Sequence, residues 1–159
     1  MIQKTIYLLF SIFAILSLLA CDSNRVFETY NEMPDCTWHR DSLVSFDIRI
    51  TDTKSPHNVL IDLRNEGSYK SCNLFLFVEI SSPNGNSIKD TVELMLANQY
   101  GKWYGTGIGD LFDHQMMYKR FIFFPDTGIY SFEFEQAMRV EELEHICNFG
   151  IRIEKAEQP

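Results

Sequence analysis

Two groupings of polar residues in the sequence could carry catalysis or bind a metal ion. His39 stands beside Asp41 and Ser42, but neighbouring residues in a strand or turn point apart, and catalytic triads are assembled from distant segments. His145 and Cys147 would share one face of a strand, yet the sequence places no third metal ligand near them. The sequence also lacks the G-x-S-x-G motif of hydrolases. We therefore predict no catalytic residue, no metal site and no cofactor.

Two other segments resemble ligand-binding loops only in part. Residues 105–110, GTGIGD, are rich in glycine but lack the lysine of a phosphate-binding P-loop and are not bracketed by a strand and an amphipathic helix. Residues 110–115, DLFDHQ, lack the alternating oxygen ligands and the distal glutamate of a calcium loop. We interpret the glycines as a bend or bulge in the backbone.

Four aromatic residues are the strongest candidates for a binding surface. Tyr100, Trp103 and Tyr104 lie close together in a glycine-containing segment, and Trp38 could be their neighbour. Exposed aromatic rings stack on the sugar rings of glycans or anchor protein partners, whereas buried rings fill a core. The sequence leaves these roles open, and the solvent exposure of the side chains would distinguish them.

The N-terminal segment contains a cysteine whose surroundings predict lipidation. Residues 6–19 are largely apolar and follow Lys4, which fits the apolar core of a signal peptide, about 7 to 15 residues, better than a membrane span of about 20. The sequence LLAC at 18–21 reads as a lipobox, in which Cys21 becomes the first residue of the mature protein. Its thiol then carries a diacylglyceryl group as a thioether. Two or more acyl chains, at about 0.8 kcal/mol per buried CH₂, hold a protein on a bilayer.

The composition of the mature part is that of one acidic domain. Removing residues 1–20 from the chain of 159 leaves 139 residues, enough for a single domain with a good core. The net charge changes from −8 to −9, because Lys4 is the only charged residue removed. Such a chain lacks the basic surface that binds nucleic acid, so we expect no nucleic-acid partner. Export would permit one disulfide, whose pairing the sequence does not identify. The available cysteines are Cys36, Cys72 and Cys147.

Alternating apolar and polar residues predict strands through most of the mature part. Residues 44–50 place four apolar side chains on one face and three polar ones on the other, which indicates a half-buried strand. Residues 73–80 are apolar on both faces, as is typical of a central strand. The turn sequence SPNGNS at 82–87 then predicts a hairpin over 73–96. Further strands are predicted at 58–65, 117–124, 128–134 and 147–155, and an irregular strand with a long loop at 101–115.

These elements predict an all-β fold, an antiparallel Greek-key β-sandwich that is Ig-like or jelly-roll-like and follows a lipoprotein signal peptide. The spacing of Asp126, Gly128 and Tyr130 matches a tyrosine corner, in which the hydroxyl bonds back to a crossover loop. Only residues 139–146 favour a helix, because apolar residues recur there at intervals of three.

We expect three parts in the chain. Residues 1–20 form a cleaved signal peptide, residues 21–35 a lipidated tether, and residues 36–159 a single β-sandwich domain.

Motifs along the whole mature chain resemble the gliding-motility lipoprotein family GldH, found in gliding and related bacteria of the Bacteroidetes group. The more specific motifs are QAMR at 136–139 and WYGTGIGD at 103–110. The others are the lipobox ending at Cys21, WHRDS, FDIRITDT, LRNEGSY, NLFLFVEI, PNG, FPDTGIYSFEFEQAMR and GIRIEK. The resemblance implies a non-catalytic envelope lipoprotein that gliding requires, with a link to the secretion system on which gliding depends. It transfers one residue role, the acylation of Cys21.

We therefore expect a lipid-anchored protein that faces the periplasm and holds other envelope or gliding proteins at a membrane. The alternative is a carbohydrate-binding lipoprotein that uses the four aromatic residues. The sequence leaves the choice between the inner and the outer membrane open.

Overall fold

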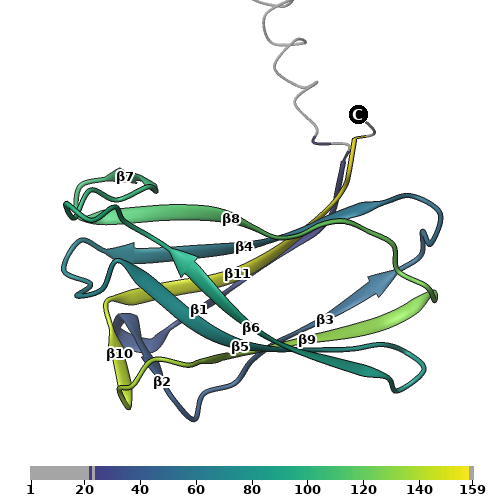
Figure 1. Ribbon diagram of the computed structural model, residues 1–159, viewed down its shortest axis with the longest axis horizontal. Helices are drawn as coiled ribbons and strands as arrows, with labels where there is room; N and C mark the ends of the chain where they lie inside the picture. The colour runs from purple at the N-terminus through teal and green to yellow at the C-terminus, as the bar shows by residue number, and fades with distance from the viewer. Residues whose placement is uncertain (1–21, 23, 158–159) are drawn as a thin grey trace, which may run out of the picture.

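The computed structural model describes Asp22 and residues 24–157, and these residues form an all-β, antiparallel structure, as predicted (Figure 1). The predicted signal peptide and Cys21 lie outside the described residues. Within the described part, no helix has the length and apolar character needed to cross a bilayer. The strands are β1 (Arg25–Glu32), β2 (Thr37–His39), β3 (Val44–Ile50), β4 (His57–Glu66), β5 (Asn73–Ser81), β6 (Ser87–Met95), β7 (Thr106–Ile108), β8 (Leu111–Ile122), β9 (Gly128–Gln136), β10 (Glu142–Glu144) and β11 (Ile146–Lys155).

Two sheets face each other as a β-sandwich (Figure 1). The larger sheet has the strand order β1-β11-β4-β8-β7, and the smaller has the order β3-β9-β5-β6. A two-stranded ribbon, β10-β2, lies at one end, far from the start of β1 and the end of β11. The hairpin predicted over 73–96 is confirmed, since β5 pairs with β6. The Greek-key connectivity stays a prediction.

The core lies between the inner faces of the two sheets, and strand alternation explains its composition. In β3 every second residue is buried, while Ser45, Asp47 and Arg49 face the solvent. β4 and β11 contribute inward side chains from the larger sheet, and β5 and β9 from the smaller one. These are Val59, Ile61, Leu63, Phe149, Ile151 and Ile153, with Leu74, Leu76, Val78, Tyr130, Phe132 and Phe134 opposite them.

Aromatic rings fill the end of the core beside the β10-β2 ribbon. Phe149 of β11 lies at the centre, with its ring centroid 4.9 Å from that of Trp38 and 4.9 Å from that of Phe134. All three side chains are fully buried. The ribbon is therefore packed onto the sandwich through Trp38, on β2.

One disulfide joins the start of the ribbon to the larger sheet. Cys36 ends a short 3₁₀ turn, η2 (Pro34–Cys36), and is bonded to Cys147 on β11, 111 residues later in the chain. The backbone N–H of Met33 also donates to the carbonyl of Cys147 at 2.7 Å. Cys72 is exposed and carries a free thiol. The pairing that the sequence left open is thus Cys36 with Cys147.

The described chain is held to the larger sheet from its first residues. The carboxylate of Asp22 forms an ion pair with the guanidinium of Arg152 on β11. Arg152 also lies 3.4 Å from Glu28 and 3.1 Å from Glu154. Residues 25–32, which were expected within the lipidated tether at 21–35, form β1 and pair with β11.

The helix predicted over 139–146 is wrong, because these residues contain the strand β10. Glu142, Leu143 and Glu144 are exposed, buried and exposed in turn, and they pair with β2. His145 has a φ of 70°, which a right-handed helix does not allow. Val140, part of the predicted apolar stripe, is 44% exposed.

The segment 101–115 is also more regular than expected. β8 begins at Leu111, before the strand predicted from residue 117, and it forms a short hairpin with β7. The glycine-rich segment 105–110 is therefore part of a hairpin at the edge of the larger sheet.

Candidate functional site

The four aromatic residues singled out in the sequence do not form one surface. Trp38 is fully buried, and its indole Nε1 donates to the carbonyl of Ser42 at 2.8 Å, so Trp38 offers no surface to a partner or glycan. Trp103 is partly buried against the core. Tyr100 and Tyr104 are 85% and 63% exposed. Tyr104 lines a pocket on the larger sheet, and Tyr100 is not among the residues that line that pocket.

The three residues of the predicted tyrosine corner lie in the loop before β9 and at its start. The hydroxyl of Tyr130 accepts from the N–H of Asp126 and donates to its carbonyl, both at 3.2 Å. Gly128 has a φ of 142°, and a Cβ there would lie 2.7 Å from Cγ of Pro83. The glycine is therefore needed where this loop meets the β5–β6 turn.

The polar groupings around the histidines make local contacts. Nδ1 of His39 accepts from the backbone N–H of Asp41 at 3.2 Å, which is a turn contact. Nδ1 of His145 lies 2.6 Å from Oε2 of Glu66, rather than beside a thiolate, because Cys147 is in the disulfide. Neither arrangement places a nucleophile against a histidine.

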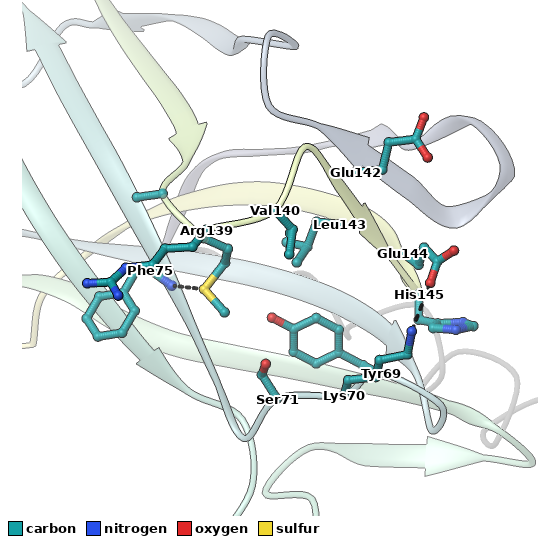
Figure 2. A pocket seen from close by; sticks show the side chains of 12 residues that line it. Tyr69, Lys70, Ser71, Phe75, Arg139, Val140, Glu142, Leu143, Glu144 and His145 are labelled. Atoms are coloured by element: carbon teal, nitrogen blue, oxygen red, sulfur yellow. Dashed lines mark hydrogen bonds and ion pairs between the residues drawn. The ribbon is translucent and has the colours of Figure 1, made fainter.

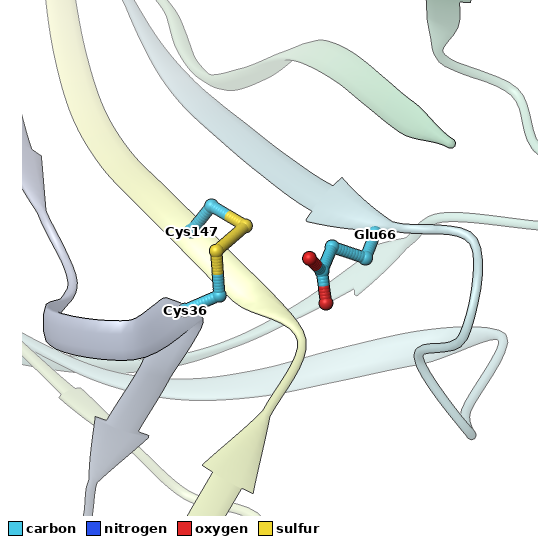
Figure 3. Close-up of side chains that lie close together, drawn as sticks. All are labelled: Cys36, Glu66 and Cys147. Carbon is cyan, nitrogen blue, oxygen red and sulfur yellow. A yellow bond between two sulfur atoms is a disulfide. The ribbon is translucent and has the colours of Figure 1, made fainter. Parts of the chain in front are cut away.

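Glu66 also lies beside the disulfide, in a cluster with metal-like spacing (Figure 3). One ligand atom from each of Cys36, Glu66 and Cys147 falls within 4.8 Å of the others. A cysteine binds a metal ion as a thiolate. Neither cysteine here is a thiolate, because their sulfur atoms are bonded to each other. The cluster is therefore a disulfide with a neighbouring carboxylate.

An apolar groove of about 640 Å³ lies beside β10, and we call it the distal groove. Figure 2 shows Tyr69, Val140 and Leu143 around its centre and Phe75 at one end. The hydroxyl of Tyr69 donates to the carbonyl of Asn73 at 3.0 Å, and burial raises the pKa of Tyr69 to about 12. The ring is thus a neutral, fixed wall of the groove.

Residues 137–140 form another wall of the distal groove, and polar contacts hold their backbone. The buried side chain of Gln136 donates to the carbonyl of Val140 at 3.0 Å and accepts from the N–H of Met138 at 2.9 Å. Arg40 donates to the carbonyls of Met138 and Val140 at 3.3 and 3.0 Å. Because these bonds fix an irregular segment, the groove is preformed.

An apolar strip continues from the distal groove across the outer face of the smaller sheet. Phe75 lines the groove, and Phe77 and Leu43 follow on the same face, where Phe77 is 51% exposed. Acidic residues flank the groove and the strip. They are Glu79, Glu93, Glu133, Glu135, Glu142 and Glu144. Lys70 and Lys89 pair with Glu144 and Glu79, and Arg139 also lines the groove, so the apolar centre has a rim in which acidic side chains outnumber basic ones.

Asp62 is a buried carboxylate that sequence reasoning did not single out. It lies on the outer face of β4 and is 4% exposed. Its Oδ1 accepts from Nε2 of Gln115 at 2.9 Å, whereas Oδ2 has no donor among the described residues. Burial raises the pKa of Asp62. The alternation of β4 could place Asp62 on the outer face, but not beside Gln115, which is 53 residues away.

Replacing Asp62 by asparagine is expected to stabilise the fold at neutral pH, by about 1 kcal/mol. Asparagine keeps an acceptor for Gln115 and carries no charge. Because the folded-state pKa of Asp62 is raised, the wild-type protein loses stability as the pH rises through that pKa. Below the ordinary pKa of 3.8 the carboxyl is neutral in both states, so the gain should vanish there. Thermal melting of both proteins from pH 3 to pH 8 measures this, and a less stable Asp62→Asn protein at pH 7 would contradict it.

The sequence is similar to proteins of one family. A family model described as GldH lipoprotein matches residues 25–153. A gliding motility lipoprotein GldH homolog of Christiangramia forsetii is 37% identical over 153 residues, covering 92% of this chain and 93% of the relative. The gliding motility lipoprotein GldH of Flavobacterium johnsoniae is 36% identical over 149 residues, covering 89% and 92% of the two chains.

Proposed function

Because this chain belongs to the GldH lipoprotein family, which is implicated in gliding motility, we propose that it is a non-catalytic envelope lipoprotein that holds a protein partner at a membrane. The partner belongs to the gliding machinery or to its associated secretion system. Acyl chains on Cys21 supply the membrane attachment, and the sandwich faces the periplasm. The names of the relatives, which describe lipoproteins rather than enzymes, support the non-catalytic part.

The observation that carries this proposal is the apolar strip that leads into the distal groove. Exposed phenylalanine side chains at the centre of a sheet face are typical of protein interfaces, where aromatic residues supply most of the binding energy. Phe75 and Phe77 are such residues, and their neighbours on the paired strands are Glu93 and Glu135. A negative rim favours a partner with a basic rim and an apolar centre.

The position of the distal groove also suits a partner that approaches from the side away from the bilayer. β1 starts four residues after Cys21, and the β10-β2 ribbon lies at the other end of the sandwich (Figure 1). Eight residues of strand span about 25 Å, at about 3.3 Å per residue. The two ends of β1 are therefore about that far apart, which would leave the groove accessible to a partner if β1 starts near the bilayer.

A photo-crosslinking amino acid at position 77 should form an adduct with one envelope protein in intact cells. Ile129 is the matched control, because it is an exposed apolar residue on the outer face of the same sheet, outside the strip. Adding Val140→Glu in the groove should reduce the yield of the position-77 adduct at least about threefold, because it buries a charge in the contact. Equal adducts at positions 77 and 129, or none at 77, would contradict the proposed contact.

A further inference from the structure

A second pocket, of about 780 Å³, is lined by outer-face residues of the larger sheet and by residues 104–106, which precede and begin β7. We call it the outer-sheet pocket. It is separate from the distal groove and shares no residue with it. Tyr104 and Tyr30, which are 63% and 51% exposed, are its aromatic residues, and between them the sheet presents Asp62, Gln115 and an Arg64–Asp113 pair. The volume is within the range of small-molecule and cofactor sites, about 300 to 1,000 Å³.

The aromatic residue on β1 is held in place by the sheet beneath it. Gly150 lies opposite Tyr30 on β11, and a Cβ there would lie 2.5 Å from Cδ1 of the ring. The hydroxyl of Tyr30 donates to Oε1 of Glu28 at 3.2 Å. Burial, followed by the charges of Asp62 and Glu28, raises the pKa of Tyr30 to about 12, so the phenol stays neutral. The ring is therefore an oriented platform that loses little freedom when a ligand stacks on it.

The hydrogen-bonding groups of the outer-sheet pocket are also oriented. Because Nε2 of Gln115 donates to Asp62, its Oε1 is turned away from Asp62 and is free to accept a hydrogen bond. Arg64 and Asp113 form a two-pronged ion pair, with contacts of 2.6 and 3.1 Å, and both stay about half exposed. Amides and ion pairs of this kind donate and accept at once, which suits hydroxyl groups.

The charges of the pocket select against an ionic ligand. The charges of Arg64 and Asp113 neutralise each other, so an anion finds no unpaired cation. The Asp62 carboxylate is shielded from solvent, so a cation cannot reach it directly. Burial lowers the pKa of His114, which keeps its ring neutral at the pocket wall. What remains is a surface without an unpaired charge, polar at Gln115 and apolar at Met95 and Met116, together with two exposed aromatic rings.

We propose that the outer-sheet pocket binds a neutral carbohydrate chain, with sugar rings on Tyr30 and Tyr104 and sugar hydroxyls on Gln115 and the Arg64–Asp113 pair. Asp62 is a positioning residue, which acts through Gln115. This inference goes beyond the proposed function and does not rest on it, since a protein partner at the distal groove and a glycan at this pocket use different faces.

The test uses the full-length mature lipoprotein in a detergent without sugar headgroups. The probes are neutral oligosaccharides of about six units, each built from glucose, mannose, xylose or N-acetylglucosamine. At least one should bind, and Tyr30→Ala and Tyr104→Ala should each weaken it about tenfold. Tyr100→Ala is the matched control, because Tyr100 is a more exposed tyrosine outside the pocket, and it should leave binding unchanged. Thermal melts establish that each variant is folded.

Asp62 gives the test a second readout. Asp62→Leu should weaken binding about fivefold because Gln115 loses its partner, whereas Asp62→Asn should bind as the wild type does. The proposal is overturned if no oligosaccharide binds at about 10 mM, or if the Tyr30→Ala/Tyr104→Ala double variant binds as the wild type does. Binding of a hexalysine peptide that is lost in Tyr30→Ala would assign the pocket to cationic ligands and would also overturn it.

Discussion

Replacing Cys36 and Cys147 together by serine is expected to lower the free energy of unfolding by about 4 kcal/mol. The disulfide closes a loop of 111 residues, most of the described chain, and so restricts the unfolded state strongly. A domain of this size has a total stability of about 5 to 15 kcal/mol, so the loss would be a large fraction of it. Urea titrations of the two proteins under oxidising conditions measure the difference.

Cys72→Ser is the control for the disulfide, because Cys72 is exposed and carries a free thiol. It should change the urea midpoint little, and a reducing agent should destabilise Cys72→Ser and the wild type equally. The double serine variant should not respond to the reducing agent at all. A loss of less than about 1 kcal/mol in the double variant would mean that the crosslink adds little to this fold.

Changing Cys21 to serine is expected to abolish lipidation completely. Only a thiol carries the diacylglyceryl group as a thioether, and a serine hydroxyl does not replace it. Cells supplied with an alkyne fatty acid should label the wild-type chain and not Cys21→Ser. Residues 22–159 exported behind an ordinary secretory leader should be found in the soluble fraction, because about 0.8 kcal/mol per buried CH₂ is lost with the acyl chains.

Cys72→Ser again gives a matched control, since it removes a different thiol and should keep both the label and the membrane fraction. A labelled Cys21→Ser protein would show that acylation occurs elsewhere. Residues 22–159 that remain with the membrane fraction would show an attachment other than the lipid.

Strand alternation predicted most of the sandwich because its signal is local. Residues 44–50 read directly as β3, and the turn at 82–87 identified the hairpin of β5 and β6. The helix at 139–146 failed because β10 has only three residues, too few for alternation to outweigh a stripe of apolar residues at intervals of three. Its pairing with β2, about 100 residues earlier, decides the structure there.

The candidate sites were harder to predict because they depend on contacts between distant strands. The sequence singled out Trp38 for its residue type, but burial is set by the packing of Phe149 against it. Conversely, no sequence motif marks Tyr30 or Asp62. They line one pocket only because β1, β11, β4 and β8 lie side by side in the larger sheet. Of the four aromatic residues selected from the sequence, Tyr104 is the one that lines the outer-sheet pocket.

If Cys21 is acylated, the ion pair of Asp22 with Arg152 would keep the domain close to the lipid, because Asp22 directly follows Cys21. Flexible linkers span about 5 to 6 Å times the square root of their residue number, so the three residues between Cys21 and β1 would allow no more than about 10 Å. An acylated chain would therefore rest against the headgroups in few orientations. A protein that meets it must come within about one domain length of the bilayer surface.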